Sequence, residues 1–256
     1  MSGYFVVASL PRSGSTTLAA MLNCHPDINC VIEPFHPLRH GGDFHRMSLR
    51  AGSVTPALNL IRHRWNGLKH VWEISNGWPF QGKPELNEEI LINSSAVLLI
   101  ERRNYLRRFV SGVISKQLGF WVGTRQEFRA RLESIQLREL EPEHVRTEIK
   151  RERTGVMAVK AILAARGVST LHVVYEDLFG EEVSSPTQIA SVLRIWRFLG
   201  FPAMTAEDCE KSCGPLFERE NYKWASPDVY RMIPRVEELE DKVGCEETGW
   251  LFQGAG

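Results

Sequence analysis

Residues 4–22 combine residue types that can hold an anion. An apolar run, Tyr-Phe-Val-Val-Ala-Ser-Leu, is followed by Pro-Arg-Ser-Gly-Ser-Thr-Thr and then by a run rich in Leu, Ala and Met. Gly14 permits a tight turn, and a helix starting after it would direct unpaired N–H groups and the positive end of its dipole at an anion. The stretch therefore predicts a phosphate-binding loop between a strand and a helix. The loop residues that would contact the anion are Arg12, Ser13, Gly14, Ser15, Thr16 and Thr17.

The loop departs from the pattern of magnesium-dependent nucleotidases. That pattern places Gly-Lys directly before the Ser or Thr that binds Mg²⁺. Here Ser15 follows Gly14, and Arg12 is the only cation of the loop. The sequence therefore disfavours a magnesium-dependent ATPase.

A second candidate anion site lies near the middle of the chain. The apolar run 96–100 ends in Glu-Arg-Arg and is followed by Asn-Tyr-Leu-Arg-Arg-Phe-Val-Ser. If a helix starts near Asn104, Arg103 lies at the carboxyl edge of a strand and Ser111 about two turns along the helix. Both side chains could then reach one phosphate.

These motifs, in this order, resemble the sulfotransferases that use 3′-phosphoadenosine-5′-phosphosulfate (PAPS). In that family a Pro-(Arg/Lys)-(Ser/Thr)-Gly-(Ser/Thr) loop binds the 5′-phosphosulfate. An Arg followed eight residues later by Ser, the spacing of Arg103 and Ser111, binds the 3′-phosphate. PRSGSTTLAAMLNCHPDINCVIEPFHP is most similar to the bacterial and carbohydrate (Gal/GlcNAc-type) branch. The resemblance covers the ordered motifs from residue 4 to about residue 200, with no usable match over 39–93, and more weakly 236–252. It includes Tyr-Glu-Asp-Leu at 175–178 and Gly-Trp at 249–250.

The resemblance implies a P-loop NTPase-like sulfotransferase fold, PAPS as the donor, and a hydroxylated small molecule or carbohydrate as the acceptor. It implies that Arg12 grips the sulfate and 5′-phosphate and that Glu33 is the catalytic base. His25 and His36 are alternative bases, because other branches of the family use His. The other interpretation of Glu33 is a carboxylate at a strand end that pairs with an arginine.

The expected elements alternate along the chain. Strands are expected at 4–9, 29–32, 70–74, 97–101 and 171–175, with helices at 15–23, 55–65, 104–118 and 187–199. Two further helices between 124 and 166 are divided by Pro142, whereas 35–53 and 76–91 are expected to be loops. This order predicts an α/β fold with a mostly parallel sheet flanked by helices and ligands at the carboxyl edge of the strands.

The whole chain sets broader limits. Its 256 residues suit a single domain over 1–256, and 43% hydrophobic with 24% charged residues is ordinary for a globular protein. Thirty-one basic residues balance 31 acidic ones, so no global field favours nucleic acid as a partner. No apolar run reaches the roughly 20 residues of a membrane span, and the start lacks signal-peptide features. We therefore expect a cytoplasmic protein.

No metal site is expected. His36, His40 and His45 lie in a Gly-rich segment without acidic or cysteine residues at ligand spacing. The five cysteines include no C-x-x-C pair, so neither zinc nor a disulfide framework is indicated.

Two competing functions remain open from the sequence. One is a P-loop-type small-molecule kinase, which would need Mg²⁺ and ATP; the other is a non-catalytic nucleotide-binding protein. The acceptor side is equally open, because tryptophans can stack on a sugar or aromatic ring or can fill the core. The tryptophans considered are Trp65, Trp72, Trp78 and Trp121. Residues 219–230 are expected either to cover the nucleotide or the acceptor or to pack as a tail.

Overall fold

The computed structural model describes residues 4–121, 123–180, 183–217 and 227–252. The chain forms two compact units, one made of Met1–Glu101 with Thr154–Phe217 and the other of Arg102–Arg153 with Glu218–Gly256. The phosphate loop predicted from the sequence lies in the first unit. Within the described residues, no helix has the length and apolar character needed to cross a membrane.

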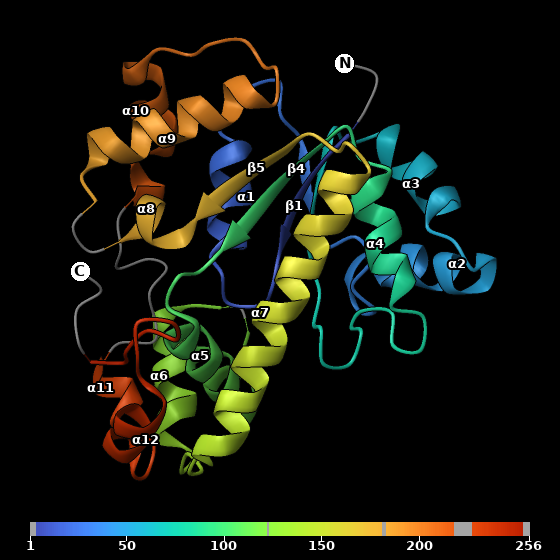
Figure 1. Ribbon diagram of the computed structural model, residues 1–256. Helices are drawn as coiled ribbons and strands as arrows, with labels where there is room; N and C mark the ends of the chain where they lie inside the picture. Colours follow the sequence, from blue (N-terminus) through green and yellow to red (C-terminus); the bar gives the residue numbers. More distant parts are fainter. Residues whose placement is uncertain (1–3, 122, 181–182, 218–226, 253–256) are drawn as a thin grey trace. The chain divides into compact units, whose positions relative to one another are not determined.

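The first unit is built on a five-stranded sheet in which all pairings are parallel, in the order β2-β3-β1-β4-β5 (Figure 1). Ser9 of β1 is in register with Val71 of β3 and Ile100 of β4, so the chain leaves these three strands at the same edge. The predicted α/β class with a parallel sheet is confirmed. The strands are β1 (Phe5–Ser9), β2 (Cys30–Ile32), β3 (Gly67–Val71), β4 (Ala96–Glu101) and β5 (Thr170–Val174).

Helices cover both faces of the sheet. Val6 and Ala8 of β1 pack in one hydrophobic cluster with α3, α4 and the C-terminal part of α7, whereas Phe5 and Val7 pack in another with α1, α9 and α10 (Figure 1). Burial on both faces explains why the central strands are apolar throughout. The helices of this unit are α1 (Ser15–Leu22), the 3₁₀ turn η1 (Arg39–Gly42), α2 (Asp43–Ala51), α3 (Thr55–Arg62), α4 (Glu85–Ile92), α8 (Tyr175–Phe179), α9 (Ser185–Phe198), α10 (Ala206–Phe217) and the part of α7 (Pro142–Ala165) from Thr154 onward.

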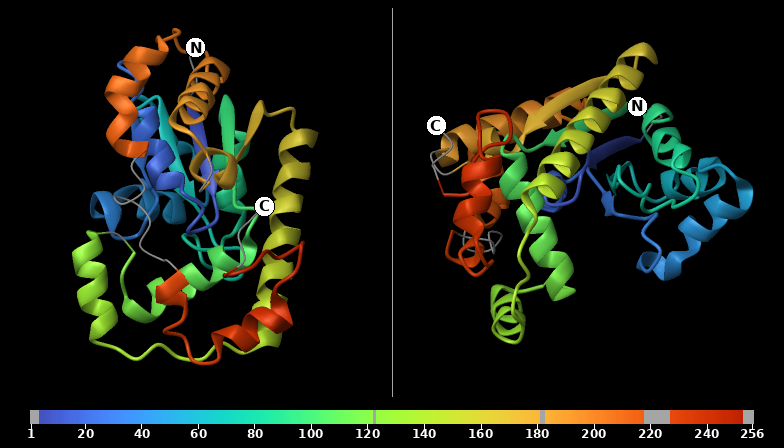
Figure 2. Two further views of the ribbon diagram at one scale, coloured as in Figure 1. Left: turned by 90° about the vertical axis from the view of Figure 1, so that its left-hand side faces the viewer. Right: turned by 60° about the horizontal axis from the view of Figure 1, so that its bottom comes forward.

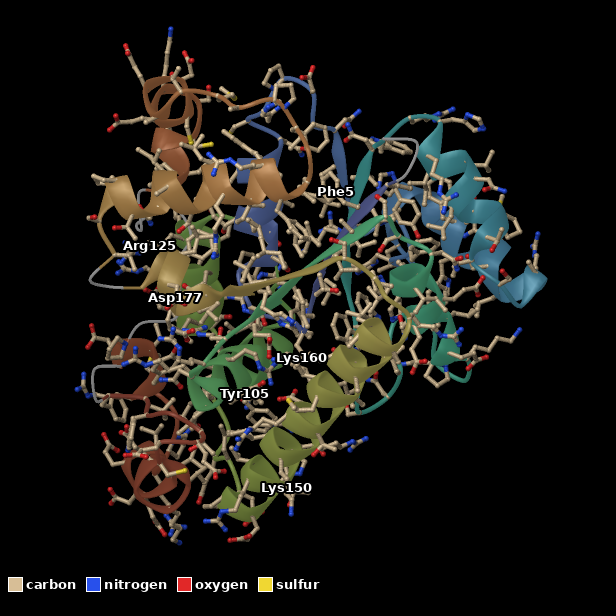
Figure 3. The ribbon with its side chains drawn as sticks, turned by 45° about the horizontal axis from the view of Figure 1, so that its top comes forward. Phe5, Tyr105, Arg125, Lys150, Lys160 and Asp177 are labelled. Carbon is tan, nitrogen blue, oxygen red and sulfur yellow. The ribbon has the colours of Figure 1, made fainter. Side chains whose placement is uncertain are left out.

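An ion pair joins α7 to the end of the sheet in the first unit. Lys160, labelled in Figure 3, places its Nζ 2.7 Å from Glu101 Oε1 at the end of β4. His172 of β5 places Nδ1 3.4 Å from the same oxygen. The acidic residue that ends β4 is therefore already paired.

Three segments differ from the sequence-based expectation. The strand expected at 70–74 is β3 (Gly67–Val71), and the expected loops at 76–91 and 35–53 contain α4 and α2. The strand β3 has no alternation of polar and apolar residues, because all five of its residues are buried, including Lys69 and His70. The helix α2 starts after Gly42, which has φ +73°, and packs Phe44 and Met47 against the core.

The second unit is helical and has its own core (green and red segments in Figure 2). Its helices are α5 (Tyr105–Leu118), α6 (Arg125–Glu133), the N-terminal part of α7, α11 (Pro227–Tyr230) and α12 (Val236–Val243). Thr124 and Glu127 form a capping box at the start of α6, and Pro142 begins α7. The predicted division of 124–166 into two helices is therefore confirmed.

Candidate functional site

The turn between β1 and α1 requires glycine for two separate reasons. Gly14 has φ +82°, a conformation that side chains with a Cβ rarely adopt. A Cβ placed at Gly14 would also lie 2.6 Å from the ring of Tyr175 and 3.4 Å from that of Phe179. The Tyr-Glu-Asp-Leu segment, which begins α8, therefore packs against the predicted phosphate loop.

The start of α1 is suited to bind an anion. Gly14 is its N-cap and has no side chain to accept from the first amides, so these N–H groups point out of the helix end with the positive end of the dipole. The hydroxyl of Ser9 at the end of β1 donates to Ser15 Oγ at 2.7 Å and fixes the start of the helix. Arg12 has φ +65°, and such strained non-glycine residues cluster at functional sites.

Lys69 is the residue that the sequence analysis missed. It lies on β3, its side chain is only 4% exposed, and its Nζ donates to Thr16 Oγ1 of the loop at 2.8 Å. The same Nζ forms an ion pair with Glu33. One buried ammonium thus connects the phosphate loop to the predicted base. The available signal was a lysine in a strand that also holds the apolar Leu68 and Val71, because buried lysines are almost always paired.

Glu33 follows β2 with φ +48°, and its side chain is 14% exposed. Besides Lys69, it pairs with Arg39, whose Nε lies 3.4 Å from Glu33 Oε2. Burial raises the pKa of Glu33, but the charge and hydrogen bond of Lys69, with the charge of Arg39, outweigh burial and leave the pKa below its ordinary value. The carboxylate is therefore ionised at neutral pH and held by two cations.

His25 has both ring nitrogens engaged by the backbone. Its Nδ1 accepts from the N–H of Asp27 at 3.1 Å, and Nε2 lies 3.1 Å from the carbonyl oxygen of Pro202. The ring is buried and packs edge-on against Trp196 at 5.2 Å. His25 therefore holds the turn after α1 and has no nitrogen available for a proton from a substrate.

His36 lies three residues after Glu33 and is half-buried. Its Nδ1 accepts from the N–H of Leu38 at 3.0 Å, so the neutral ring carries its proton on Nε2. Burial lowers the pKa of His36 below its ordinary value, and the charge of Arg39 adds to this although Glu33 opposes it. Because the lone pair of Nδ1 is held by the backbone and Nε2 carries the proton, the neutral ring of His36 is a poor candidate base.

Arg103 and Ser111, the predicted 3′-phosphate residues, belong to the second unit. Arg103 comes two residues after the end of β4, and Ser111 lies two turns into α5, as the sequence predicts. The first amides of this helix are occupied: Leu106 N–H donates to the carbonyl oxygen of Thr248 at 2.8 Å, and Arg107 N–H to Asn104 Oδ1 at 2.8 Å. An anion bound at the start of α5 would therefore be held mainly by side chains, because the backbone amides of the helix end are already occupied.

The Gly-Trp feature near the C-terminus closes this helix start. Asn104 Nδ2 donates to the carbonyl oxygen of Trp250 at 2.7 Å. Gly249 has φ +80°, and a Cβ there would lie 2.5 Å from the side chain of Asn104. The feature has a structural role within the second unit.

The tryptophans considered for an acceptor differ in environment. Trp72 is buried in the hydrophobic core, and the partly buried Trp65 packs against that core. Trp78 stands edge-on to His36, with ring centroids 5.2 Å apart, and Trp121 of the second unit is 43% exposed. In the segment 219–230, residues Asn221, Tyr222, Lys223 and Trp224 lie outside the described residues.

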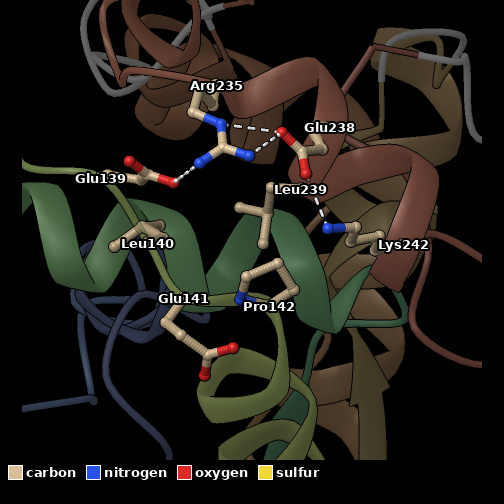
Figure 4. Close-up of a pocket in the computed structure, with 8 residues that line it drawn as sticks. All are labelled: Glu139, Leu140, Glu141, Pro142, Arg235, Glu238, Leu239 and Lys242. Carbon is tan, nitrogen blue, oxygen red and sulfur yellow. Dashed lines mark hydrogen bonds and ion pairs between the residues drawn. The ribbon is translucent and has the colours of Figure 1, made fainter.

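A cavity of about 380 Å³ in the second unit lies between the start of α7 and α12 (Figure 4). Arg235 pairs with Glu139 at 3.0 Å and with Glu238, which also pairs with Lys242 at 2.6 Å. The opposite charges of these exposed ion pairs offset one another. None of the lining residues is a predicted site residue. The lining residues are Glu139, Leu140, Glu141, Pro142, Arg235, Glu238, Leu239 and Lys242.

Across the part of the chain that the structure describes, no three His, Cys, Asp or Glu side chains are grouped to hold a metal ion. A scan of protein-family models gave no match to the chain, and neither did a search of curated proteins. The sequence motifs and the contacts of Lys69 are therefore the features that bear on function.

Proposed function

We propose that the protein is a cytoplasmic sulfotransferase of the P-loop-like sulfotransferase fold, which transfers the sulfuryl group of PAPS to a hydroxyl of a small molecule or carbohydrate. The observation that carries this proposal is the buried Lys69, which contacts both Thr16 of the phosphate loop and Glu33. It connects the anion site to a carboxylate at the carboxyl edge of a parallel sheet, where α/β folds bind ligands.

The charge around the loop fits a highly anionic donor. Arg12, Arg39 and Lys69 are cationic, and Glu33 pairs with Arg39 and Lys69. The open start of α1 adds partial positive charge. Lys69 also supplies, from the neighbouring strand, an ammonium of the kind that the Walker pattern places in the loop itself. This arrangement supports binding of a phosphosulfate at a loop that lacks Gly-Lys.

When bound, PAPS would supply the sulfuryl group and the leaving phosphate. Arg12, Lys69 and the first amides of α1 would hold the negative charge that develops on the transferring oxygens. Glu33 would accept the proton of the acceptor hydroxyl. An anion at the loop would compete with Glu33 for Lys69, and weakening that ion pair raises the pKa of Glu33 and makes it a better base.

The assignment of the 3′-phosphate to Arg103 and Ser111 rests on the family resemblance. The spacing of these residues, eight apart from a strand end into α5, agrees with that assignment. The acceptor is proposed only by class, as a molecule with a free hydroxyl.

A mass-spectrometric screen tests the proposal. The protein is incubated with PAPS, EDTA and a panel of sugars, phenols and alcohols, and products are monitored for added sulfate. We expect at least one sulfated product, strongly reduced with Glu33→Gln and Lys69→Met, while Lys160→Met retains activity as the matched lysine control. A chain that yields no sulfated product but phosphorylates the same panel with Mg²⁺ and ATP would belong to the kinase class.

A further inference from the structure

Three cysteines of the first unit gather where the end of α1 meets α10. Cys24 follows α1, and its Sγ lies 3.4 Å from the carbonyl oxygen of Ser212. Cys213 of α10 reaches back, with Sγ 3.6 Å from the carbonyl oxygen of Met21. Cys209 lies one turn before Cys213 on the same buried face. The thiols of the two segments thus point toward each other's backbone across the contact.

The three thiols differ in accessibility and in acidity. Cys24 is half-buried, whereas Cys209 and Cys213 are fully buried. A hydrogen bond with Cys213 lowers the pKa of the Cys24 thiol although burial opposes it. The same hydrogen bond, with burial, raises the pKa of Cys213. This is the arrangement of an accessible, more acidic thiol beside a resolving thiol, which characterises redox-sensitive cysteines.

We propose that Cys24 and Cys213 form a reversible redox site that hydrogen peroxide converts into an intramolecular disulfide. The Cys24 thiolate attacks one peroxide oxygen, the O–O bond breaks, and Cys24 becomes a sulfenic acid while the released hydroxide takes up a proton to form water. The thiol of Cys213 then attacks the sulfur of Cys24: the S–S bond forms, the S–O bond breaks, and the departing hydroxyl takes the proton of the Cys213 thiol and leaves as a second water. The two thiols together lose two electrons, and one hydrogen peroxide accepts them and is reduced to two waters.

The disulfide would tie the end of the helix that carries the phosphate loop to α10. This inference does not depend on the proposed activity, because it rests only on the cysteines of the first unit. Two other cysteines serve as references. Cys30 is buried in β2, and burial raises its pKa to about 12; Cys245 of the second unit is exposed, with its Sγ 3.3 Å from Thr248 Oγ1.

The test uses the full chain, reduced and then exposed to a small excess of hydrogen peroxide. Remaining thiols are blocked with N-ethylmaleimide under denaturing conditions, and the digest is mapped by mass spectrometry. We expect a peptide containing Cys24 linked to one containing Cys213, reversed by dithiothreitol and unchanged in the matched control Cys245→Ser. Cys24→Ser, at a half-buried position, should abolish the link and leave Cys213 open to the blocking reagent.

A second variant separates the two chemical steps. In Cys213→Ala, dimedone should trap a sulfenic acid on Cys24. The proposal is overturned if Cys24 stays fully reactive toward N-ethylmaleimide after Cys245 has been oxidised, if Cys24 links only to another chain, or if Cys24→Ser leaves an unchanged amount of disulfide at Cys213.

Discussion

At the scale of single residues, the central feature is the pair formed by Lys69 and Glu33. Burial lowers the pKa of Lys69, and the charge of Glu33 opposes this shift. Bringing both charges out of water is costly, so such a pair adds little stability compared with apolar residues but is damaging to break. Because Lys69 also donates to Thr16, the ion pair is coupled directly to the loop.

Lys69→Met is expected to lower the free energy of unfolding by about 2 to 4 kcal/mol at pH 7, because it leaves Glu33 buried with Arg39 alone. In Lys69→Met with Glu33→Gln, the two losses should be less than additive by about 1 to 3 kcal/mol. Urea denaturation measures both values. The control Lys160→Met removes a more exposed pair and should cost less than about 1 kcal/mol. Strict additivity would contradict direct coupling of Lys69 and Glu33.

The same pair has a defined pH dependence. Because the pKa of Glu33 is lowered in the folded protein, its contribution is complete above its ordinary value of 4.5 and is lost as the pH falls through the lower folded value. The difference in unfolding free energy between wild type and Glu33→Gln should thus be constant from pH 7 to about pH 5 and shrink below it. A difference that disappears already between pH 7 and 6 would implicate a histidine.

Turnover measurements on variants identify the catalytic base. Glu33→Gln keeps shape but cannot accept a proton, so kcat/KM for sulfate transfer should fall about 10²- to 10⁴-fold. His25→Asn and His36→Asn should retain near-normal turnover where they fold, since both ring nitrogens of His25 and Nδ1 of His36 are engaged by the backbone. Steady-state kinetics with PAPS and an acceptor from the screen make the comparison. Near-normal turnover in Glu33→Gln with a collapse in His36→Asn would transfer the role to the histidine.

At the scale of elements, the turn between β1 and α1 is shaped by α8. Gly14→Ala should lower the free energy of unfolding by about 1 to 2 kcal/mol because of the left-handed backbone conformation. The displacement of Tyr175 by the new Cβ should add to this loss. Gly82→Ala is the matched control: Gly82 has φ +81°, and no described heavy atom lies within 4 Å of its Cβ position. Thermal denaturation gives the comparison. Equal losses for both variants would show that the contact with Tyr175 is unimportant.

The elements that the sequence predicted are those with strong local signals. The first strand, the turn at Gly14 and the start of α1 were predicted within a residue, because an apolar run, a glycine and a helix-forming run are local features. Lys69 could not be assigned, because its partners Thr16 and Glu33 come from other elements and meet it only through the pairing of β3 with β1 and β2. The helix α2 was missed because glycines and histidines precede and interrupt its apolar spacing.

At the scale of the whole molecule, the resemblance assigns recognition of the donor's 3′-phosphate to Arg103 and Ser111. Arg103→Ala should then weaken binding of 3′,5′-adenosine bisphosphate by about 1.5 to 3 kcal/mol, the scale of a charge-assisted hydrogen bond. Binding of adenosine 5′-phosphosulfate, which has no 3′-phosphate, should be nearly unchanged. Titration calorimetry measures both ligands. Equal losses for the two would show that Arg103 does not recognise the 3′-phosphate.

The most direct test of the central claim is calorimetry of wild-type protein with 3′,5′-adenosine bisphosphate and with Mg·ATP, each with and without EDTA. The loop lacks Gly-Lys and draws its buried ammonium from β3, so the bisphosphate should bind equally well in EDTA and far more tightly than Mg·ATP. Arg12→Ala should weaken this binding. Tight ATP binding that requires Mg²⁺, with little affinity for the bisphosphate, would contradict the sulfotransferase assignment.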